Sequence, residues 1–240
     1  MSFYRPGGEE LTRHALQLAA LRPGQDLLDI GCGDGDAAAL AAGEFGLKVI
    51  AIDKDKDAVA RAKEKGLDAR EMDAGWLEFT SRSFDAVLME CVFSVLDRQI
   101  EAMHEAWCML RPGGVLILSD LYRTDPDLRR WEKDYKDAMA VYNRPRSEGD
   151  CEKNDVLPSP YLQDGALVMD GLYLLLDELG FETLVCEDRS EDLKQWVGQA
   201  IFDYGSVKNW QKACPGARCC GDVGKKGTGY FLLLARKKDA

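Results

Sequence analysis

The stretch Asp26–Gly35 constrains the fold of this chain most tightly, because it combines a strand, a forced turn and a helix start. Leu27, Leu28 and Ile30 form the short apolar run that is typical of a buried parallel strand. Three glycines at alternate positions follow, and without side chains they let the backbone approach a ligand closely. The Ala-rich segment 37–45 favours a helix, whose free N–H groups face the same place. The stretch therefore predicts a strand, turn and helix that hold a ligand.

The chemistry of this turn narrows the class of ligand. Its glycines, Gly31, Gly33 and Gly35, follow a GxGxG spacing, whereas dinucleotide-binding turns use GxGxxG. Asp34 lies inside the turn and Asp36 just beyond it, and we expect both carboxylates to repel phosphate. The turn therefore favours a ligand that is cationic or zwitterionic, such as S-adenosylmethionine, over a dinucleotide.

Length and charge exclude several functional classes. The chain has 240 residues, which fits one α/β domain with insertions. It carries 31 Lys and Arg against 42 Asp and Glu, a formal charge of −11, so nucleic acid is a poor partner. No signal peptide or apolar run long enough to span a membrane is present, which predicts a cytoplasmic protein. Its eight cysteines are then expected to be reduced thiols.

Strand and helix signals alternate through the first half of the chain. Short apolar or β-branched runs at 48–52, 67–72, 84–89 and 115–118 are separated by helical patterns, which predicts a doubly wound, Rossmann-like parallel sheet. We expect a single domain over 1–240, with helix 164–179, strand 181–187 and strand 230–235 in its second half. Three segments flank or interrupt the sheet: an N-terminal arm and helix at 1–24, a helical and loop lid insertion at 123–164, and a Cys-rich loop at 205–228.

Candidate binding residues follow the ends of the predicted strands. In an open α/β sheet, ligands gather at the carboxyl ends of the strands. Asp53 ends the second strand, where an acid is well placed to accept both hydroxyls of an adenosine ribose, and Lys54 follows it. Asp73 and Ala74 end the third strand, where Asp73 is a candidate for the adenine amine. Glu90 and Cys91 enter the site by their position after the fourth strand.

Taken together, these motifs resemble those of class I S-adenosylmethionine-dependent methyltransferases. The resemblance is carried by residues 28–35, Asp53, the pair Asp73-Ala74, the pair Phe84-Asp85 and the turn 110–114. It implies a seven-stranded sheet with the last strand antiparallel. It also implies S-adenosylmethionine as cofactor, with Asp29 and the glycine turn, which includes Cys32, on the methionine part and Asp53 on the ribose. The arm 5–8 with Thr12 is similar to the N-terminal element that covers the cofactor in ubiquinone-type and arsenite-type relatives.

The acceptor side is less constrained by these motifs. A sulfonium is a good leaving group, so methyl transfer requires mainly alignment and exclusion of water. We expect His14 and His104 to have surface or packing roles, whereas Asp120 and Tyr122 are better placed as bases. Neither the acceptor nor the oligomeric state follows from the pattern.

A cysteine-rich loop precedes the predicted last strand. The candidate catalytic residues are Cys214, Cys219 and Cys220, three thiols near Lys225 and Lys226 that could hold a thiophilic species. Ordinary thiols in an irregular loop are the equally weighted alternative, and no metal is assigned.

The predicted function is a methyltransferase that acts on a small molecule, with a thiol, a selenol or a cysteine-held metalloid as the finer candidates. Two other classes stay open. One is a non-catalytic protein that binds S-adenosylmethionine or a thiophilic ion, and the other is a nicotinamide-dependent oxidoreductase.

Overall fold

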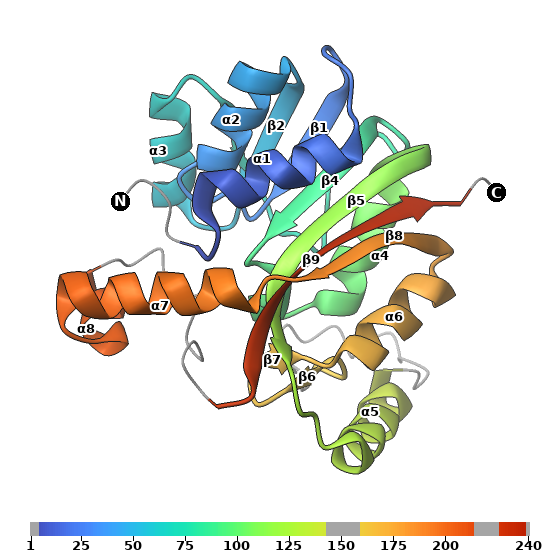
Figure 1. The fold of residues 1–240 in the computed structure, drawn as a ribbon. Coiled ribbons are helices and arrows are strands. Elements are labelled where there is room, and N and C mark those ends of the chain that lie inside the picture. The colour runs from blue at the N-terminus through green and yellow to red at the C-terminus, as the bar shows by residue number, and fades with distance from the viewer. Residues whose placement is uncertain (1–4, 143–158, 214–225, 239–240) are drawn as a thin grey trace.

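The structure, a computed structural model, describes residues 5–142, 159–213 and 226–238. Its centre is one twisted sheet in the strand order β3-β2-β1-β4-β5-β9-β8 (Figure 1). A two-strand hairpin, β6 with β7, joins the sheet where β7 pairs with the end of β5. The main strands are β1 Asp26–Ile30, β2 Lys48–Asp53, β3 Asp68–Glu71, β4 Phe84–Glu90, β5 Leu110–Arg123, β8 Phe181–Asp188 and β9 Thr228–Lys237.

The first half of the sheet is parallel, as the alternation of strands and helices predicts. β1 pairs with β2 on one side and with β4 on the other, and both pairings are parallel. The pairing aligns Asp29 with Ala51 of β2 and with Leu88 of β4. The order of strands reverses at β1, because β2 and β3 lie on one side of it and β4 and β5 on the other. The crevice above such a reversal is where open α/β sheets bind ligands.

The second half confirms the predicted antiparallel last strand. Among the described residues the sheet has nine strands instead of the predicted seven, because the hairpin of β6 and β7 joins it. β9 runs antiparallel to both of its neighbours, β5 and β8. Leu232, Leu233 and Leu234 of β9 are buried, so its side chains fill both faces of the sheet. β8 is the outer strand here, and most of its residues are exposed or half-buried.

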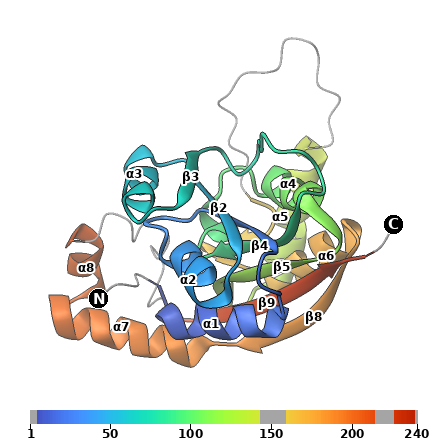
Figure 2. The same cartoon turned by 90° about the horizontal axis from the view of Figure 1, so that it is seen from above.

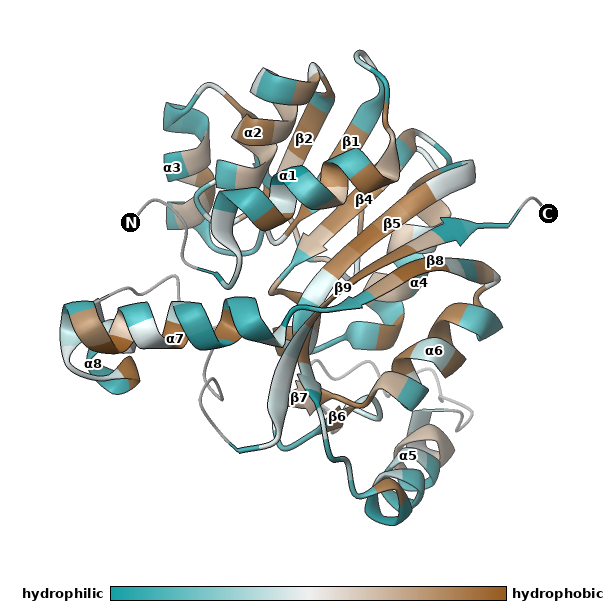
Figure 3. Cartoon of the chain, in the orientation of Figure 1, coloured by the Kyte–Doolittle hydropathy of each residue, from teal (hydrophilic) through white to brown (hydrophobic). Residues whose placement is uncertain are grey.

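Helices cover both faces of the sheet (Figure 2). α1 and α2 pack on one face together with α7, while α4 and α6 pack on the other. Figure 3 shows the apolar strands β4, β5 and β9 between these layers, with hydrophilic residues on the outer sides of the helices. The helices are α1 Gly8–Ala19, α2 Asp36–Phe45, α3 Lys56–Glu64, η1 Phe93–Val95, α4 Gln99–Met109, α5 Leu128–Tyr142, α6 Met169–Glu178, α7 Ser190–Tyr204 and α8 Val207–Ala213.

The predicted helix over 164–179 is wrong at its start. Residues 162–167 form the hairpin of β6 (Leu162–Gln163) and β7 (Ala166–Leu167), and the helix begins only at Met169. Asp164 and Gly165 have φ of 52° and 82°, which an Asp-Gly pair adopts in a two-residue hairpin turn. The Asp-Gly signal outweighs the helical spacing of the apolar residues here.

The predicted loop over 205–228 contains a helix at its start. Ser206 accepts a hydrogen bond from the Asn209 amide at 3.1 Å and so caps α8. Trp210 is buried and packs edge-on against Trp196 of α7, with ring centroids 4.4 Å apart. In the lid segment 123–164 the structure describes α5, the hairpin strand β6 and their flanking residues. Within the described part of the chain, no helix is long and apolar enough to cross a membrane.

Candidate functional site

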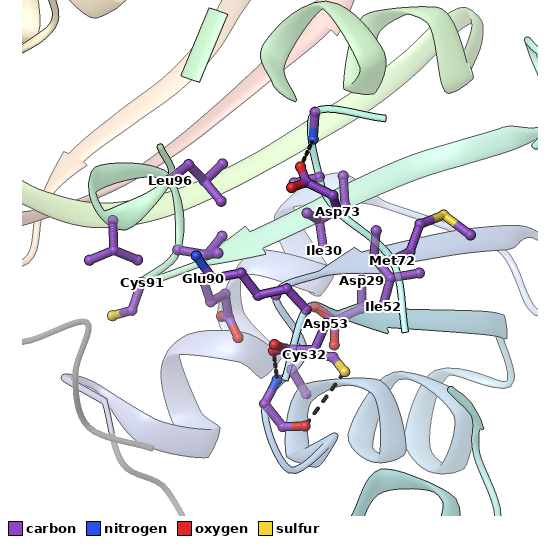
Figure 4. A pocket seen from close by; sticks show the side chains of 18 of the residues that line it. Asp29, Ile30, Cys32, Ile52, Asp53, Met72, Asp73, Glu90, Cys91 and Leu96 are labelled. Carbon is purple, nitrogen blue, oxygen red and sulfur yellow. Dashed lines mark hydrogen bonds between the residues drawn. The ribbon is translucent and has the colours of Figure 1, made fainter. Parts of the chain in front are cut away.

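A cavity of about 270 Å³ opens at the carboxyl ends of β1, β2 and β4 (Figure 4). Nine of the ten predicted binding residues line it: Asp29, Gly31, Cys32, Gly33, Asp53, Lys54, Asp73, Ala74 and Glu90. Gly35 does not. A Cβ on Gly35 would lie 2.5 Å from Leu67 Cδ1 and 2.9 Å from Ala62 Cβ, so this glycine allows α2 and α3 to pack closely.

The other two glycines have different positions in the turn. Gly31 has φ of 72°, and a Cβ there would overlap the Val92 side chain. Gly33 has φ of 53° and would meet nothing within 4 Å, because it faces the open cavity. Close packing therefore requires glycine at 31 and at 35, while access to the cavity requires it at 33.

Asp53 fixes the turn from the neighbouring strand. Its Oδ2 accepts a hydrogen bond from the Gly33 amide at 2.9 Å, and its Oδ1 accepts one from the Asp55 amide at 2.9 Å. Each oxygen keeps a second lone pair for a ligand. The residue therefore holds the glycine backbone in place and still presents acceptors to the cavity.

The charge argument drawn from Asp34 and Asp36 is wrong as stated. Arg61 of α3 donates to Asp34 Oδ1 at 2.7 Å, and Lys65 forms an ion pair with Asp36. Both carboxylates are thus compensated by cations that lie about thirty residues away in sequence. The acidic character of the cavity comes from other residues instead.

Asp29 is the most unusual group in the cavity. Its side chain is buried, and Oδ2 has no hydrogen-bond partner among the residues that the structure describes. Burial raises the pKa of this carboxyl to about 8, and the charges of Glu90 and Asp53 add to the shift, while Arg5 opposes it. A buried, unsatisfied carboxyl oxygen is costly, and such groups concentrate at functional sites.

Glu90 lies at the end of β4, two residues beyond the partner of Asp29. Arg5 Nη2 lies 2.6 Å from Glu90 Oε2, and Thr12 Oγ1 of α1 lies 3.1 Å and 3.2 Å from the two carboxyl oxygens. Burial raises the pKa of Glu90, and the Arg5 guanidinium lowers it. These contacts attach the N-terminal segment to the carboxyl edge of the sheet.

Apolar side chains also line the cavity, among them Met72, Ala74 and Leu96. Asp73 lines it too, and its Oδ1 accepts a hydrogen bond from the Gly75 amide at 2.7 Å. Apolar side chains together with one acid suit a flat heterocycle that carries an amino group.

Several lining residues were not among the predicted ones. Arg5 comes from the arm, which the sequence associates with the cofactor only through resemblance, and its contact with Glu90 depends on the tertiary fold. Cys91, by contrast, was expected in the site from its position after the fourth strand; it has φ of 54°, and its thiol lies 2.9 Å from the Tyr230 hydroxyl. Val92 lies two residues after the end of β4, so its position after a strand end was the available signal, whereas Leu96 lines the cavity only because η1 comes between it and the strand.

The candidate bases, all within the described residues, lie outside the lining of the cavity. Asp120 is fully buried and accepts from the Ser94 amide at 2.8 Å, the Ser94 hydroxyl at 2.6 Å and the Leu121 amide at 2.7 Å. Tyr122 lies further along β5. His14 pairs with Glu187 at 3.0 Å, and His104 lies beside Trp107.

The predicted cysteine cluster of Cys214, Cys219 and Cys220 lies outside the described residues. Within residues 5–142, 159–213 and 226–238, no three or more His, Cys, Asp or Glu side chains are arranged so that they could hold a metal ion. The four cysteines described there, Cys32, Cys91, Cys108 and Cys186, are free thiols.

Comparison with known protein families places the site in context. Residues 28–118, which include the glycine turn, β2 and β4, match the family model described as "Methyltransferase domain". The uncharacterized methyltransferase YodH of Bacillus subtilis is 36% identical over 118 residues, 47% of this chain and 50% of that protein. An arsenite methyltransferase of Halobacterium salinarum is 28% identical over 182 residues, 72% of this chain and 41% of that protein. The chain thus spans about half or less of the length of these relatives.

Solved structures share the fold. A Haemonchus contortus phosphoethanolamine N-methyltransferase 2, solved in complex with S-adenosyl-L-methionine, aligns with a TM-score of 0.70 and 20% sequence identity. The alignment covers 99% of this chain and 54% of that one. At this identity the likeness concerns the architecture of the sheet and its helices.

Proposed function

We propose that the chain, whose residues 28–118 match the methyltransferase-domain family model, is a class I S-adenosylmethionine-dependent methyltransferase that transfers the methyl group of S-adenosylmethionine to a small-molecule acceptor. The observation that carries the proposal is the buried Asp29 carboxyl, whose Oδ2 lacks a partner among the described residues and lies in a cavity at the strand reversal. An ammonium group of a ligand would satisfy that oxygen.

The lining residues fit the cofactor part by part. Apart from Asp34 and Asp36, which are paired with Arg61 and Lys65, five carboxyl side chains line the cavity against three cations, Arg5, Lys54 and Arg98; the five are Asp29, Asp53, Asp73, Glu90 and Asp97. This excess suits a ligand that carries a sulfonium and an ammonium. The same excess disfavours the pyrophosphate of a nicotinamide dinucleotide, which supports the methyl donor over the oxidoreductase alternative.

Particular residues would hold particular parts of the cofactor. Asp29 and Glu90 would take the ammonium of the methionine part, and Arg5 its carboxylate. Asp53 would accept the ribose hydroxyls, and Asp73 the adenine amine beside Met72 and Leu96. Glycine at 33 leaves the cradle open, since a Cβ there would project into unfilled space.

The residues of this chain contribute orientation more than proton transfer. When bound, the cofactor supplies an activated methyl group on a sulfonium, which needs alignment with the nucleophile more than a protein catalyst. Arg5, Thr12 and Glu90 link the N-terminal segment to the cavity and so help to exclude water from one side of it. Neither Asp120 nor Tyr122, the two predicted bases, lines the cavity, so we propose an acceptor that is nucleophilic without a strong base.

Thiols, selenols and trivalent metalloids are acceptors of this kind, and they are the finer proposal for the substrate. The arsenite methyltransferase relative supports it, as does the predicted thiol cluster at Cys214, Cys219 and Cys220. The phosphoethanolamine N-methyltransferase relatives point instead to an amine. A cytoplasmic location also belongs to the proposal.

The proposal is tested by incubating the full chain with S-adenosylmethionine that is isotopically labelled in its methyl group. A panel of thiols, selenols, arsenite and primary amines is added, and the products are analysed by mass spectrometry. We expect label in one class of acceptor and formation of S-adenosylhomocysteine. Cofactor binding without transfer to any acceptor would favour the non-catalytic alternative, and tight NAD binding without cofactor binding would overturn the proposal.

A further inference from the structure

Three carboxylates converge on one face of the sheet at the cavity. Asp29 is aligned with Ala51 of β2 and with Leu88 of β4. Asp53 and Glu90 each lie two residues further along those strands, and residues two apart in a strand point to the same face. The cluster therefore comprises Asp29 with an acidic neighbour on each side (Figure 4).

The charges around this cluster do not balance within the cavity. Arg5 is the cation nearest to it, and its guanidinium is in contact with Glu90. On α1 the polar contact is the Thr12 hydroxyl, and on α2 the Ala38 amide donates to Asp29. On the glycine turn lie the Cys32 thiol and Asp34, and Asp34 is already paired with Arg61.

A buried site with two or more carboxylates and one cation holds a proton most readily on the group with the poorest hydrogen bonding. That group is Asp29, because Thr12 and Arg5 contact Glu90, and Asp53 accepts two backbone amides. The unpartnered Asp29 Oδ2 is where an incoming ammonium would replace that proton.

We propose that binding of S-adenosylmethionine expels one proton from the Asp29–Glu90 pair, so that the site binds its cofactor more tightly as the pH rises toward neutrality. The proton leaves the Asp29 carboxyl for solvent, and the ligand ammonium takes its place as the compensating charge. No bond to the ligand forms or breaks. This inference rests on the proposed function, because it assumes a cofactor with an ammonium group.

The magnitude follows from the burial of Asp29. The pKa of Asp29 in the protein without ligand is about 8. Below this pH, the fraction of molecules with an ionised Asp29 rises about tenfold for each pH unit. The affinity for S-adenosylhomocysteine, which keeps the ammonium, is then expected to rise about 30-fold between pH 5.5 and pH 7.0. At pH 7.0 each binding event should release about 0.9 proton.

The experiment is isothermal titration of the full chain with S-adenosylhomocysteine at several pH values, in pairs of buffers with different ionisation enthalpies. The matched ligand is 5′-methylthioadenosine, which lacks the amino-acid part and should bind with nearly pH-independent affinity. Proton release with the first ligand and not with the second supports the inference. S-adenosylhomocysteine binding that is independent of pH and buffer overturns it, while leaving the proposed function intact.

Four variants test which carboxyl group releases the proton when the ligand binds. Asp29→Asn should abolish the proton release, and Glu90→Gln should move the midpoint of the pH dependence to lower pH by removing a like charge. Asp120→Asn and His14→Asn are matched controls, since Asp120 is a buried acid outside the cavity and His14 a surface imidazole. Both controls should keep the pH dependence, and its loss in either one would overturn the assignment to the pair.

If neither ligand binds at any pH, the proposed function itself has failed. The experiment therefore distinguishes a failure of the proposed function from a failure of the proposed proton release.

Discussion

The glycine turn gives the sharpest test of the site, because its glycines are required for different reasons. We compare Gly33→Ala with Gly35→Ala, and use Gly24→Ala as the matched control. Gly24 has φ of 87°, a Cβ added there would meet nothing within 4 Å, and the residue does not line the cavity. All three substitutions place alanine in the left-handed region, which costs about 1–2 kcal/mol each.

The additional effects separate the three variants. Gly33→Ala adds a methyl group that faces the open cavity, so it should lose as little stability as Gly24→Ala but weaken cofactor binding tenfold or more, about 1.4 kcal/mol. Gly35→Ala forces a methyl group to within 2.5 Å of Leu67, and this overpacking adds about 1–3 kcal/mol to the strain. Gly35→Ala should therefore lose the most stability.

The assays are denaturant unfolding for stability and calorimetric titration with S-adenosylhomocysteine for binding. Gly24→Ala should bind the ligand like the unmodified protein. The reasoning is refuted if Gly33→Ala binds normally, or if it unfolds much more readily than Gly24→Ala. It is also refuted if Gly35→Ala is as stable as the control.

Three further predictions concern stability. Lys237→Met should lower the free energy of unfolding by about 1–3 kcal/mol, because the buried ammonium donates hydrogen bonds to the Trp107 and Leu110 carbonyls at 2.7 Å and 2.8 Å. An unchanged midpoint of denaturant unfolding would contradict this prediction. Trp210→Ala should lower the free energy of unfolding by about 3–5 kcal/mol, and the amides of α8 should exchange hydrogen faster as a result. Because the pKa of Asp29 is raised, the folded protein binds one more proton than the unfolded chain between about pH 4 and 8. The free energy of unfolding should therefore fall as the pH rises through that range, and Asp29→Asn should make this pH dependence weaker.

Local chemistry explains which parts of the fold the sequence could predict. The run Leu27–Ile30, the glycine turn and the acids at the ends of β2, β3 and β4 carry their signals within a few residues. Strand alternation then brings those strand ends together, so nine predicted residues share one cavity. The parallel half of the sheet follows from the same signals.

What could not be predicted depends on contacts between distant segments. Arg61 compensates Asp34 across 27 residues, and Arg5 reaches Glu90 only after α1 packs on the sheet. Gly35 shares its spacing with Gly33, yet only the position of α3 shows that it serves packing. At 162–167 helical spacing and a hairpin turn compete in one sequence, and tertiary pairing with β5 favours the hairpin.

The central claim is that the cavity at the ends of β1, β2 and β4 binds S-adenosylmethionine. The most direct measurement is calorimetric titration of the unmodified chain and of Asp53→Ala with S-adenosylhomocysteine, with NAD as the competing ligand. We expect one ligand per chain for the unmodified protein, at least tenfold weaker binding for Asp53→Ala, and no heat with NAD. Binding of NAD, or equal affinity of the folded Asp53→Ala variant for S-adenosylhomocysteine, would contradict it.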